Sequence, residues 1–531
     1  MTRADVQRVA GEYFGERRLV LRSRAGYPKK TRLSKPSYPA VTPSGGHSQF
    51  FAELRARPKP PPRVRFVEPA TEVQVQALRE GVTLRANANP FNDLYHLELR
   101  FGVGSEQIRE LELLGQYLGR IGSARFPGEQ LRRRLFELST TLTATAELDR
   151  FVVRLQGPQQ HMEAALGLLA DLMAAPERER RPLRQIRRET WAFRRYERKN
   201  PPNVGMALRD HVLYGEYSQY HRQLGPRGAR HTSARELLAA WRQVQGYAVE
   251  IGYVGREAAT AVAGAVERRL RFAEALKPAV PHVVYARHVA PETTIYFVPR
   301  RDAVQTQLWF AVEGEPVPAG ELAAADAFSE YFGGSMAGLV FQEVREFRAL
   351  AYAASARFAR DEEPGQRGHL LGHVGCQADK AFDVLDVMVG LITKMPERGD
   401  RLELVRSTLL RGQETESPSF RELQDKLRDW QILGYTQDPR RELLPAYAAL
   451  DFADIVGFYR RHVAGRPLAI MIVGDPRKTD PERLRRYGKL VKLRGACAAA
   501  SGWLEAPFSF RVRANFSPLP GEGRANHRPR A

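Results

Sequence analysis

The order of the expected strands and helices occurs twice along this chain of 531 residues, and this repetition constrains the fold more than any single motif does. In each copy an alternating strand leads to an apolar helix, a short glycine turn and a second helix. Two strands, several helices and a closing strand follow. The pattern predicts two homologous modules, at residues 66–275 and 283–495. The expected elements of the first copy span 96–103, 106–121, 130–138, 140–155, 159–174, 178–199, 234–244 and 248–254, and those of the second span 306–312, 319–332, 338–347, 351–358, 369–377, 381–395, 402–412, 452–463 and 467–473.

The strands of both copies alternate apolar and polar residues, which is typical of a sheet with one buried face. A doubly wound parallel sheet is buried on both faces and needs strands that are apolar throughout. The sequence therefore predicts an α+β fold in which each module is an antiparallel-rich sheet covered on one face by helices.

The segments outside the two modules are expected to differ from them in character. Residues 1–24 contain an amphipathic helix at 4–14 and a strand at 18–22, which cannot form a core alone and so indicate the tail of a preceding module. Residues 25–65 are rich in proline, whose fixed φ and missing N–H predict an extended linker. Residues 508–531 lack periodicity, and a disordered tail is expected there.

The chain is strongly basic, with 82 Lys and Arg against 61 Asp and Glu. The densest run of cations lies at residues 178–199, where a nucleic-acid partner has to be considered. Apolar residues interrupt that run at nearly helical spacing, however, so we interpret it as an amphipathic helix with a solvated basic face.

The composition does not indicate a membrane-spanning protein or a protein stabilised by disulfides. No window approaches the roughly 18 uninterrupted apolar residues of a membrane span, so a soluble chain is expected. Two cysteines far apart, Cys376 and Cys497, support neither a disulfide framework nor a cysteine zinc site.

The histidines show no spacing that suits a metal ion. His369 and His373 are four residues apart on an expected strand, where they lie roughly 13 Å from each other. His211, His221 and His231 have no ligand spacing, and solvated or capping roles are expected.

The duplicated modules, a linker with GYPKK and KPSYPA, and the segment GGSMAGLVFQEVREFRALAY resemble the insulinase/pitrilysin family of zinc metallopeptidases, the inverzincins. In that family two halves, each of two modules, close around a peptide chamber, and one half carries zinc on an H-x-x-E-H helix. This chain resembles the end of the first half, the linker, and then the C-terminal, non-catalytic half. The resemblance therefore implies a proline-linked pair of peptidase-like modules without a zinc centre.

Counting back from the turn Gly122-Ser123, the positions of the H-x-x-E-H residues hold Leu113, Gln116 and Tyr117. Leucine has no donor atom, glutamine cannot act as a base, and neutral tyrosine is a rare zinc ligand. Glu189 lies roughly where the family's third ligand falls, but without the imidazole pair a surface carboxylate is the favoured interpretation. No metal is expected on this chain, and zinc is expected in the catalytic half.

Arg345 and Tyr352 match the family's substrate-binding pair, which reaches toward the scissile peptide near the zinc of the other half. A guanidinium there can hold a peptide carbonyl, and a phenol can donate a hydrogen bond to developing charge. The alternative is structural: Arg345 pairs with Glu343 or Glu346 while Tyr352 packs.

These features predict a substrate-binding, non-zinc-binding half that contributes to proteolysis with a catalytic half, supplied upstream or as a separate subunit. The chain alone is predicted to be inactive, and peptide is expected to bind extended against a sheet edge. A catalytically inactive assembly subunit is the alternative, and a nucleic-acid binder is less favoured. No signal peptide is recognised, so a cytoplasmic chain is the default unless the missing half carries an export signal.

Overall fold

The computed structural model divides the chain into two compact units, Met1–Pro61 and Pro62–Ala531. The first unit contains α1 (Arg3–Tyr13), which confirms the helix predicted at 4–14, and α2 (Gln49–Ala56). Thr2 and Asp5 form a capping box that closes the N-terminus of α1. The residues that the structure describes are 2–24, 26, 48–57, 64–282, 284–288, 290–301, 303–360, 365–415, 417–495 and 510–512.

Two predictions for the first unit are wrong. Residues 18–22 form no strand, and the side chain of Leu21 is 84% exposed, because no described segment pairs with their backbone. The supposedly extended linker at 25–65 contains α2, where Ser48 caps a stretch of eight residues free of proline. Most of the remaining linker lies outside the described residues.

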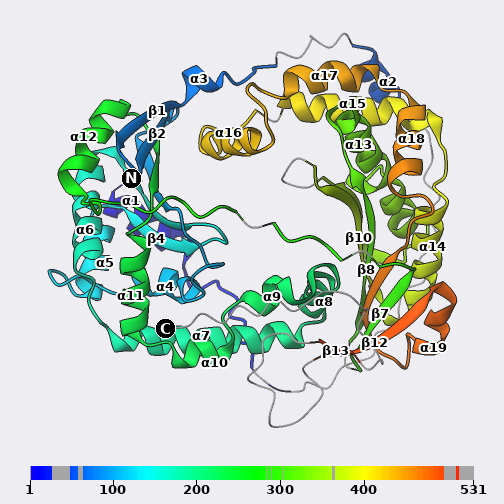
Figure 1. Cartoon of the computed structure of the whole chain (residues 1–531), viewed down its shortest axis with the longest axis horizontal. Coiled ribbons are helices and arrows are strands. Elements are labelled where there is room, and N and C mark those ends of the chain that lie inside the picture. The colour runs from blue at the N-terminus through cyan, green and yellow to red at the C-terminus, as the bar shows by residue number, and fades with distance from the viewer. Residues whose placement is uncertain are drawn as a thin grey trace, which may run out of the picture. The chain divides into compact units, whose positions relative to one another are not determined.

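The first module contains a six-stranded sheet in which only β2 and β6 pair in parallel (Figure 1). The antiparallel-rich sheet predicted for this module is therefore confirmed. The hairpin of β1 and β2, which sequence reasoning missed, turns at Gly81 with φ +74°. In spatial order the strands are β1 (Gln74–Arg79), β2 (Val82–Ala88), β6 (Val249–Gly255), β3 (Leu94–Phe101), β5 (Phe151–Pro158) and β4 (Thr141–Ala146).

The second module contains a seven-stranded sheet with a related order (Figure 1). Strand β7 pairs in parallel with β11 and β12, and the other neighbours are antiparallel. The strand beside β7, β12, comes from the end of the module, whereas its counterpart β1 comes from the beginning. In spatial order the strands are β13 (Phe510–Val512), β12 (Lys489–Gly495), β7 (Thr294–Pro299), β11 (Ala469–Gly474), β8 (Gln305–Pro316), β10 (Arg367–Gln377) and β9 (Ala351–Ala359).

Strand β13 corrects the prediction of a disordered tail at 508–531. Residues 510–512 pair antiparallel with β12, which shows that a short apolar-basic segment can find a partner without any long-range periodicity. The rest of that predicted tail lies outside the described residues.

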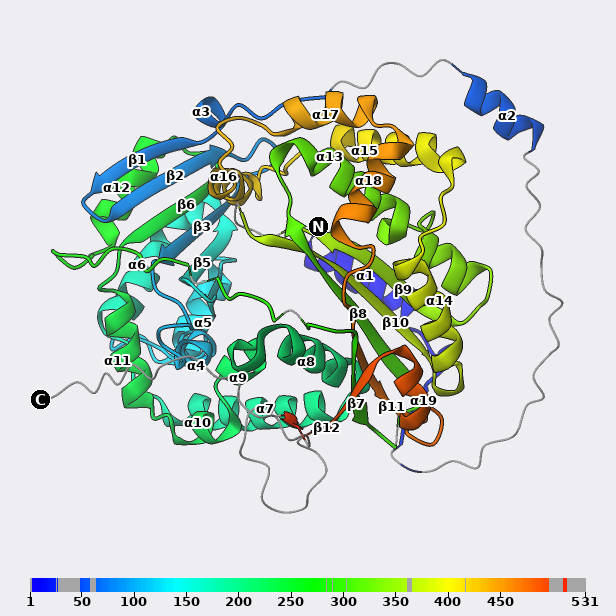
Figure 2. The ribbon, with the colours of Figure 1, turned by 45° about the vertical axis from the view of Figure 1, so that its right-hand side comes forward.

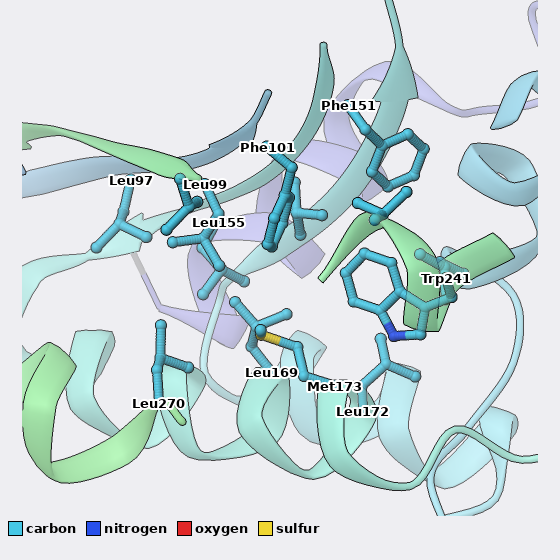
Figure 3. Packing of buried hydrophobic residues seen from close by; sticks show 14 of the residues in the cluster. Leu97, Leu99, Phe101, Phe151, Leu155, Leu169, Leu172, Met173, Trp241 and Leu270 are labelled. Carbon is cyan, nitrogen blue, oxygen red and sulfur yellow. The ribbon is translucent and has the colours of Figure 1, made fainter. Parts of the chain in front are cut away.

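Helices cover one face of the first sheet and enclose its core (Figure 3). Trp241 is fully buried, and its ring meets that of Phe101 edge-on at 5.6 Å between centroids. The helices that contribute to this core are α4 (Leu111–Leu118), α5 (Gly128–Glu137), α6 (Met162–Ala174), α7 (Arg180–Lys199), α10 (Pro226–His231), α11 (Ala234–Val244) and α12 (Ala259–Arg269).

The corresponding face of the second sheet is covered in the same way. The duplication extends to helix starts, because α11 and α18 (Phe452–His462) each begin with a capping box eight residues before a buried aromatic side chain, Trp241 in α11 and Tyr459 in α18. The further helices are α13 (Leu322–Ser329), α14 (Ala381–Thr393), α15 (Leu402–Thr415), α17 (Arg440–Ala449) and α19 (Pro481–Leu484), with α3 (Pro69–Glu72) and α9 (Gln219–Arg222) outside this layer.

On the second face of each sheet lies a helix that comes from the other module, and the sequence did not predict this exchange of helices. Helix α8 (Pro201–Tyr214) follows the first module's long basic helix in sequence, yet it packs on β8 and β11 of the second sheet (Figure 2). Its Val204, Ala207 and Leu208 join Ala311 and Met471 in a separate apolar cluster.

Helix α16 (Leu423–Ile432) makes the reverse crossing, from the second module to the open face of the first sheet (Figure 2). The Gln424 amide donates to Asn87 Oδ1 at 2.8 Å and to the Tyr253 carbonyl at 2.9 Å. A Cβ at Gly252 would come within 2.7 Å of Gln424 Oε1, so a larger residue there would have to displace the Gln424 amide. The prediction of sheets covered on one face only is therefore incomplete.

Candidate functional site

Arg345 lies on a π-helical turn, Phe341–Glu346, directly before edge strand β9. π-Helical turns are rare in proteins, and those that occur are often found at functional sites. Ala349, with φ +48°, reverses the chain between the turn and the strand, and its N–H donates to the Arg345 carbonyl at 3.0 Å. This tight connection places residues 345 and 352 close together, although the sequence predicted an ordinary helix at 338–347.

The guanidinium of Arg345 contacts two aromatic rings. Its Cζ lies 4.7 Å from the ring centroid of Phe341 and 4.7 Å from that of Tyr352. Glu346 lies at 3.5 Å from Nε, and 36% of the arginine side chain stays exposed. Tyr352 is 83% exposed, so a ligand can reach its hydroxyl as well as the guanidinium. The structure thus brings together the two residues predicted to bind substrate.

Strand β9 carries Tyr352 and is the last strand of its sheet in the described part of the chain. It pairs with β10 on one side, and Ala353, Ser355 and Arg357 on it are exposed. Edge strands present unpaired backbone groups that an extended peptide can pair with. The aromatic-arginine pair therefore stands at the start of a strand that can accept a peptide.

The positions matched to the family's metal motif lie in the first module. Leu113 and Gln116 on α4, and Glu189 on α7, line one cavity of about 220 Å³, so the structure does bring these three residues together. Tyr117 is fully buried, and its hydroxyl donates to the Glu179 carbonyl at 2.8 Å. Burial raises the pKa of Tyr117 to about 12, which keeps the phenol protonated.

Glu189 is engaged by neighbours rather than left for a metal ion. Its carboxylate accepts a hydrogen bond from Arg120 Nη2 at 2.7 Å and another from Gln185 Nε2 at 2.9 Å. These bonds, that from Arg120 first, lower the pKa of Glu189. The favoured interpretation of Glu189 as a surface carboxylate among arginines agrees with this geometry.

Sequence reasoning missed the other walls of the cavity. Glu112 lies beside Leu113, and burial raises its pKa even though Arg194, at 3.7 Å, opposes that shift. Thr190, Phe193 and Leu224 complete the lining. Periodicity could have placed Glu112 beside Leu113, but Leu224 comes from a distant loop that no local signal connects to α4.

No group of three or more His, Cys, Asp or Glu residues stands where it could hold a metal ion within the described parts of the chain. His369 and His373 lie on β10, as predicted, and His373 Nε2 is 3.0 Å from Gln307 Oε1. The solvated or capping roles predicted for His211 and His221 are incomplete, because their rings also contact each other at 3.4 Å between Nδ1 and Nε2. Helix α8 carries His211 and the short helix α9 carries His221, and their spacing in sequence does not reveal this contact.

In the part of the chain that the structure describes, neither a membrane-spanning helix nor a reactive cysteine is found. None of the described helices is long and apolar enough to cross a membrane. Cys376 is free and buried, and burial raises the pKa of its thiol to about 12, so it stays protonated and unreactive. Cys497 lies outside the described residues.

The fold and these sites can now be compared with known proteins. Residues 250–399 match the family model described as Peptidase M16 inactive domain. The chain resembles the inactive half of an M16 peptidase. This finding confirms the resemblance inferred from the sequence. No curated protein matches the chain.

Solved structures share the fold of this M16-like half at low identity. The peptidase M16 inactive domain from Pseudomonas fluorescens is 18% identical with a TM-score of 0.60, and the match covers 76% of this chain and 98% of that one. The periplasmic protease PqqL from Escherichia coli is 15% identical with a TM-score of 0.60, over 90% of this chain and 51% of that one. A mutant of the ferredoxin protease FusC, in complex with Arabidopsis ferredoxin, is 15% identical with a TM-score of 0.59, over 90% and 50%. The chain thus spans about half the length of PqqL and FusC.

Proposed function

We propose that this chain is the substrate-binding half of an M16-type peptidase and that it orients peptide for a separate, zinc-bearing catalytic half. The observation that carries the proposal is the exposed pair of Arg345 and Tyr352 at the start of edge strand β9. The turn carries Arg345 and the strand that follows carries Tyr352, and both side chains present polar atoms to solvent.

The chemistry of the pair suits a peptide group near bond cleavage. Arg345 carries planar N–H donors that can bind a peptide carbonyl. The Tyr352 hydroxyl can donate a hydrogen bond to the oxygen that becomes negative in a tetrahedral intermediate. The exposed backbone of β9 can hold the rest of the peptide in an extended conformation.

The hydrolytic step has to come from the partner half. The resemblance matches Leu113 and Gln116, which line the cavity of the first module, to a metal-binding imidazole and a catalytic carboxylate, and the Tyr117 hydroxyl donates to the Glu179 carbonyl. A second candidate function is that of an assembly subunit. Phe341 favours it, because the ring already occupies one side of Arg345 without any substrate.

The test is an enzyme reconstituted from this chain and a half that carries H-x-x-E-H. We expect Arg345→Ala to raise KM and lower kcat, and Tyr352→Phe to lower kcat about 100-fold, as loss of a transition-state donor does. Tyr217→Phe is the matched control, because Tyr217 is also an exposed tyrosine of this chain, at 57%. Unchanged turnover in both variants would leave the assembly role as the better account.

A further inference from the structure

The cavity at the degenerate metal motif differs from a metal site in how its charged groups are satisfied. Glu189 is bound to Arg120 at 2.7 Å, and Glu112 accepts a hydrogen bond from the backbone N–H of Leu224. Arg194 pairs with Glu197 at 2.9 Å and lies 3.7 Å from Glu112. Every charged group that lines the cavity therefore has an opposite charge or a hydrogen-bond donor beside it, and none of them needs a bound ion to balance its charge.

Two neutral polar groups on the same wall have no such partner. The Thr190 hydroxyl is buried without a hydrogen bond. Gln116 is exposed on α4, and its amide makes no side-chain hydrogen bond within the described part of the molecule. A buried hydroxyl without a partner costs free energy unless a ligand or water satisfies it. These two groups can together donate to and accept from an uncharged polar ligand.

The rest of the lining is apolar. Leu113 is 2% exposed and Leu224 is 9% exposed, and both face the cavity, while Phe193 stands at its rim and is 57% exposed. Leu113 thus contributes an apolar side chain to the cavity at the position that the resemblance matches to a metal ligand. The volume of about 220 Å³ is below the roughly 300–1,000 Å³ typical of small-molecule sites, so it suits a single amino-acid residue.

We infer that this cavity is a second peptide-binding subsite, which takes one uncharged residue with an apolar side chain and satisfies its backbone amide through Thr190 and Gln116. The inference rests on the proposed function, since it assigns the residue that a bound peptide places in the first module. Loss of the metal motif would then have replaced metal ligation with side-chain recognition.

The experiment measures binding of single blocked amino acids to the full chain by ligand-observed NMR, without a catalytic half. The probes are N-acetyl-phenylalaninamide and N-acetyl-leucinamide, with N-acetyl-lysinamide and N-acetyl-glutamic acid amide as charged comparisons. We expect saturable binding of the neutral probes and at least about tenfold weaker binding of the charged ones, because the cavity offers no free counter-charge.

Two conservative variants locate the binding. Thr190→Val keeps the shape of the side chain and removes the hydroxyl, and Gln116→Ala removes the amide; each should weaken the neutral probes about two- to tenfold. Thr141→Val and Gln130→Ala are the matched controls, because both residues are exposed elsewhere in the first module. Thermal unfolding of each variant checks that the fold is kept.

Three results overturn the inference: no saturable binding of a neutral probe, equal binding of the charged probes, or no effect of both cavity variants. None of them affects the proposed function, because turnover with Arg345 and Tyr352 variants tests a site in the other module. Conversely, probe binding that follows Thr190 and Gln116 supports the subsite even if the Arg345 variants leave turnover unchanged.

Discussion

Helices with different contacts cover the second faces of the two sheets. Helix α8 meets the second sheet through Leu208 and its apolar neighbours. Helix α16 packs Leu423 and Leu427 against the first module and adds the amide of Gln424 and the guanidinium of Arg428. Apolar contact is non-directional and depends on buried area, while hydrogen bonds fix position and charge pairs respond to pH. Helix α8 therefore holds the two modules together through buried apolar area, and α16 also fixes their relative position through hydrogen bonds.

Arg100 shows how closely the polar crossing is connected. Its side chain is 9% exposed, and its guanidinium lies 2.6 Å from Glu98, 3.2 Å from Glu250 and 2.9 Å from Asp425 of α16. Burial would raise the pKa of Glu98, but His96, Arg100 and Arg154 together hold it well below its usual range. A cation shared by three carboxylates on two modules makes the network cooperative, so that loss of one member affects the others.

The largest expected effect comes from breaking the apolar crossing. Leu208→Ala removes a fully buried side chain from the cluster of α8 and should destabilise the chain by about 2–5 kcal/mol. Hydrogen–deuterium exchange should show faster exchange in α8 and β11, with α16 little changed. Leu404→Ala, at a 46% exposed position of α15, is the control and should cost far less.

If Leu208→Ala loosened α16 as much as α8, the two crossings would form one cooperative unit, and the distinction between them would fail.

A smaller effect is expected from the polar crossing. Gln424→Ala leaves Asn87 Oδ1 and the Tyr253 carbonyl without their buried donor, which should cost about 1–3 kcal/mol. Exchange should increase in α16 and at the end of β6, while α8 stays protected. Gln431→Ala is the control, since Gln431 is exposed on the same helix. Equal effects of the two substitutions would mean that Gln424 does not hold the helix in place.

The sequence predicted what depends on local pattern and missed what depends on distant partners. The local sequence pattern located α11 to the residue, because that signal lies within the helix. Neither α8 nor α16 was among the expected elements, and their exchange between the sheets was missed because the sheet that a helix covers depends on distant partners. Strands β1, β2, β7 and β12 were also missed, and each belongs to its sheet through the neighbours that it pairs with.

The candidate sites divide in the same way. The pair of Arg345 and Tyr352 could be found because both residues lie in one short motif, and the structure brings their side chains together. Leu113 and Gln116 were placed by counting from a glycine turn. The π-helical turn under Arg345, and the approach of Leu224 to the cavity, depend on tertiary packing and have no local signature.

The smallest expected effect is that of acid, which should loosen α16 but not α8. Low pH alters the charge of carboxylates and leaves the shape of the side chains unchanged. Burial raises the pKa of Glu250, but Arg428, Arg85 and Arg100 outweigh it, and the net pKa lies below the ordinary value of 4.5. A carboxyl whose pKa is lower in the folded state contributes its full stabilisation above about pH 4.5, and loses it as pH falls through the folded pKa. Exchange of α16, corrected for the intrinsic pH dependence, should therefore stay constant from pH 7 to pH 5 and increase only below 4.5, while that of α8 stays unchanged. Glu250→Gln should abolish the acid step in α16, and a step that persists in this variant would assign the sensitivity to another group, such as Asp425.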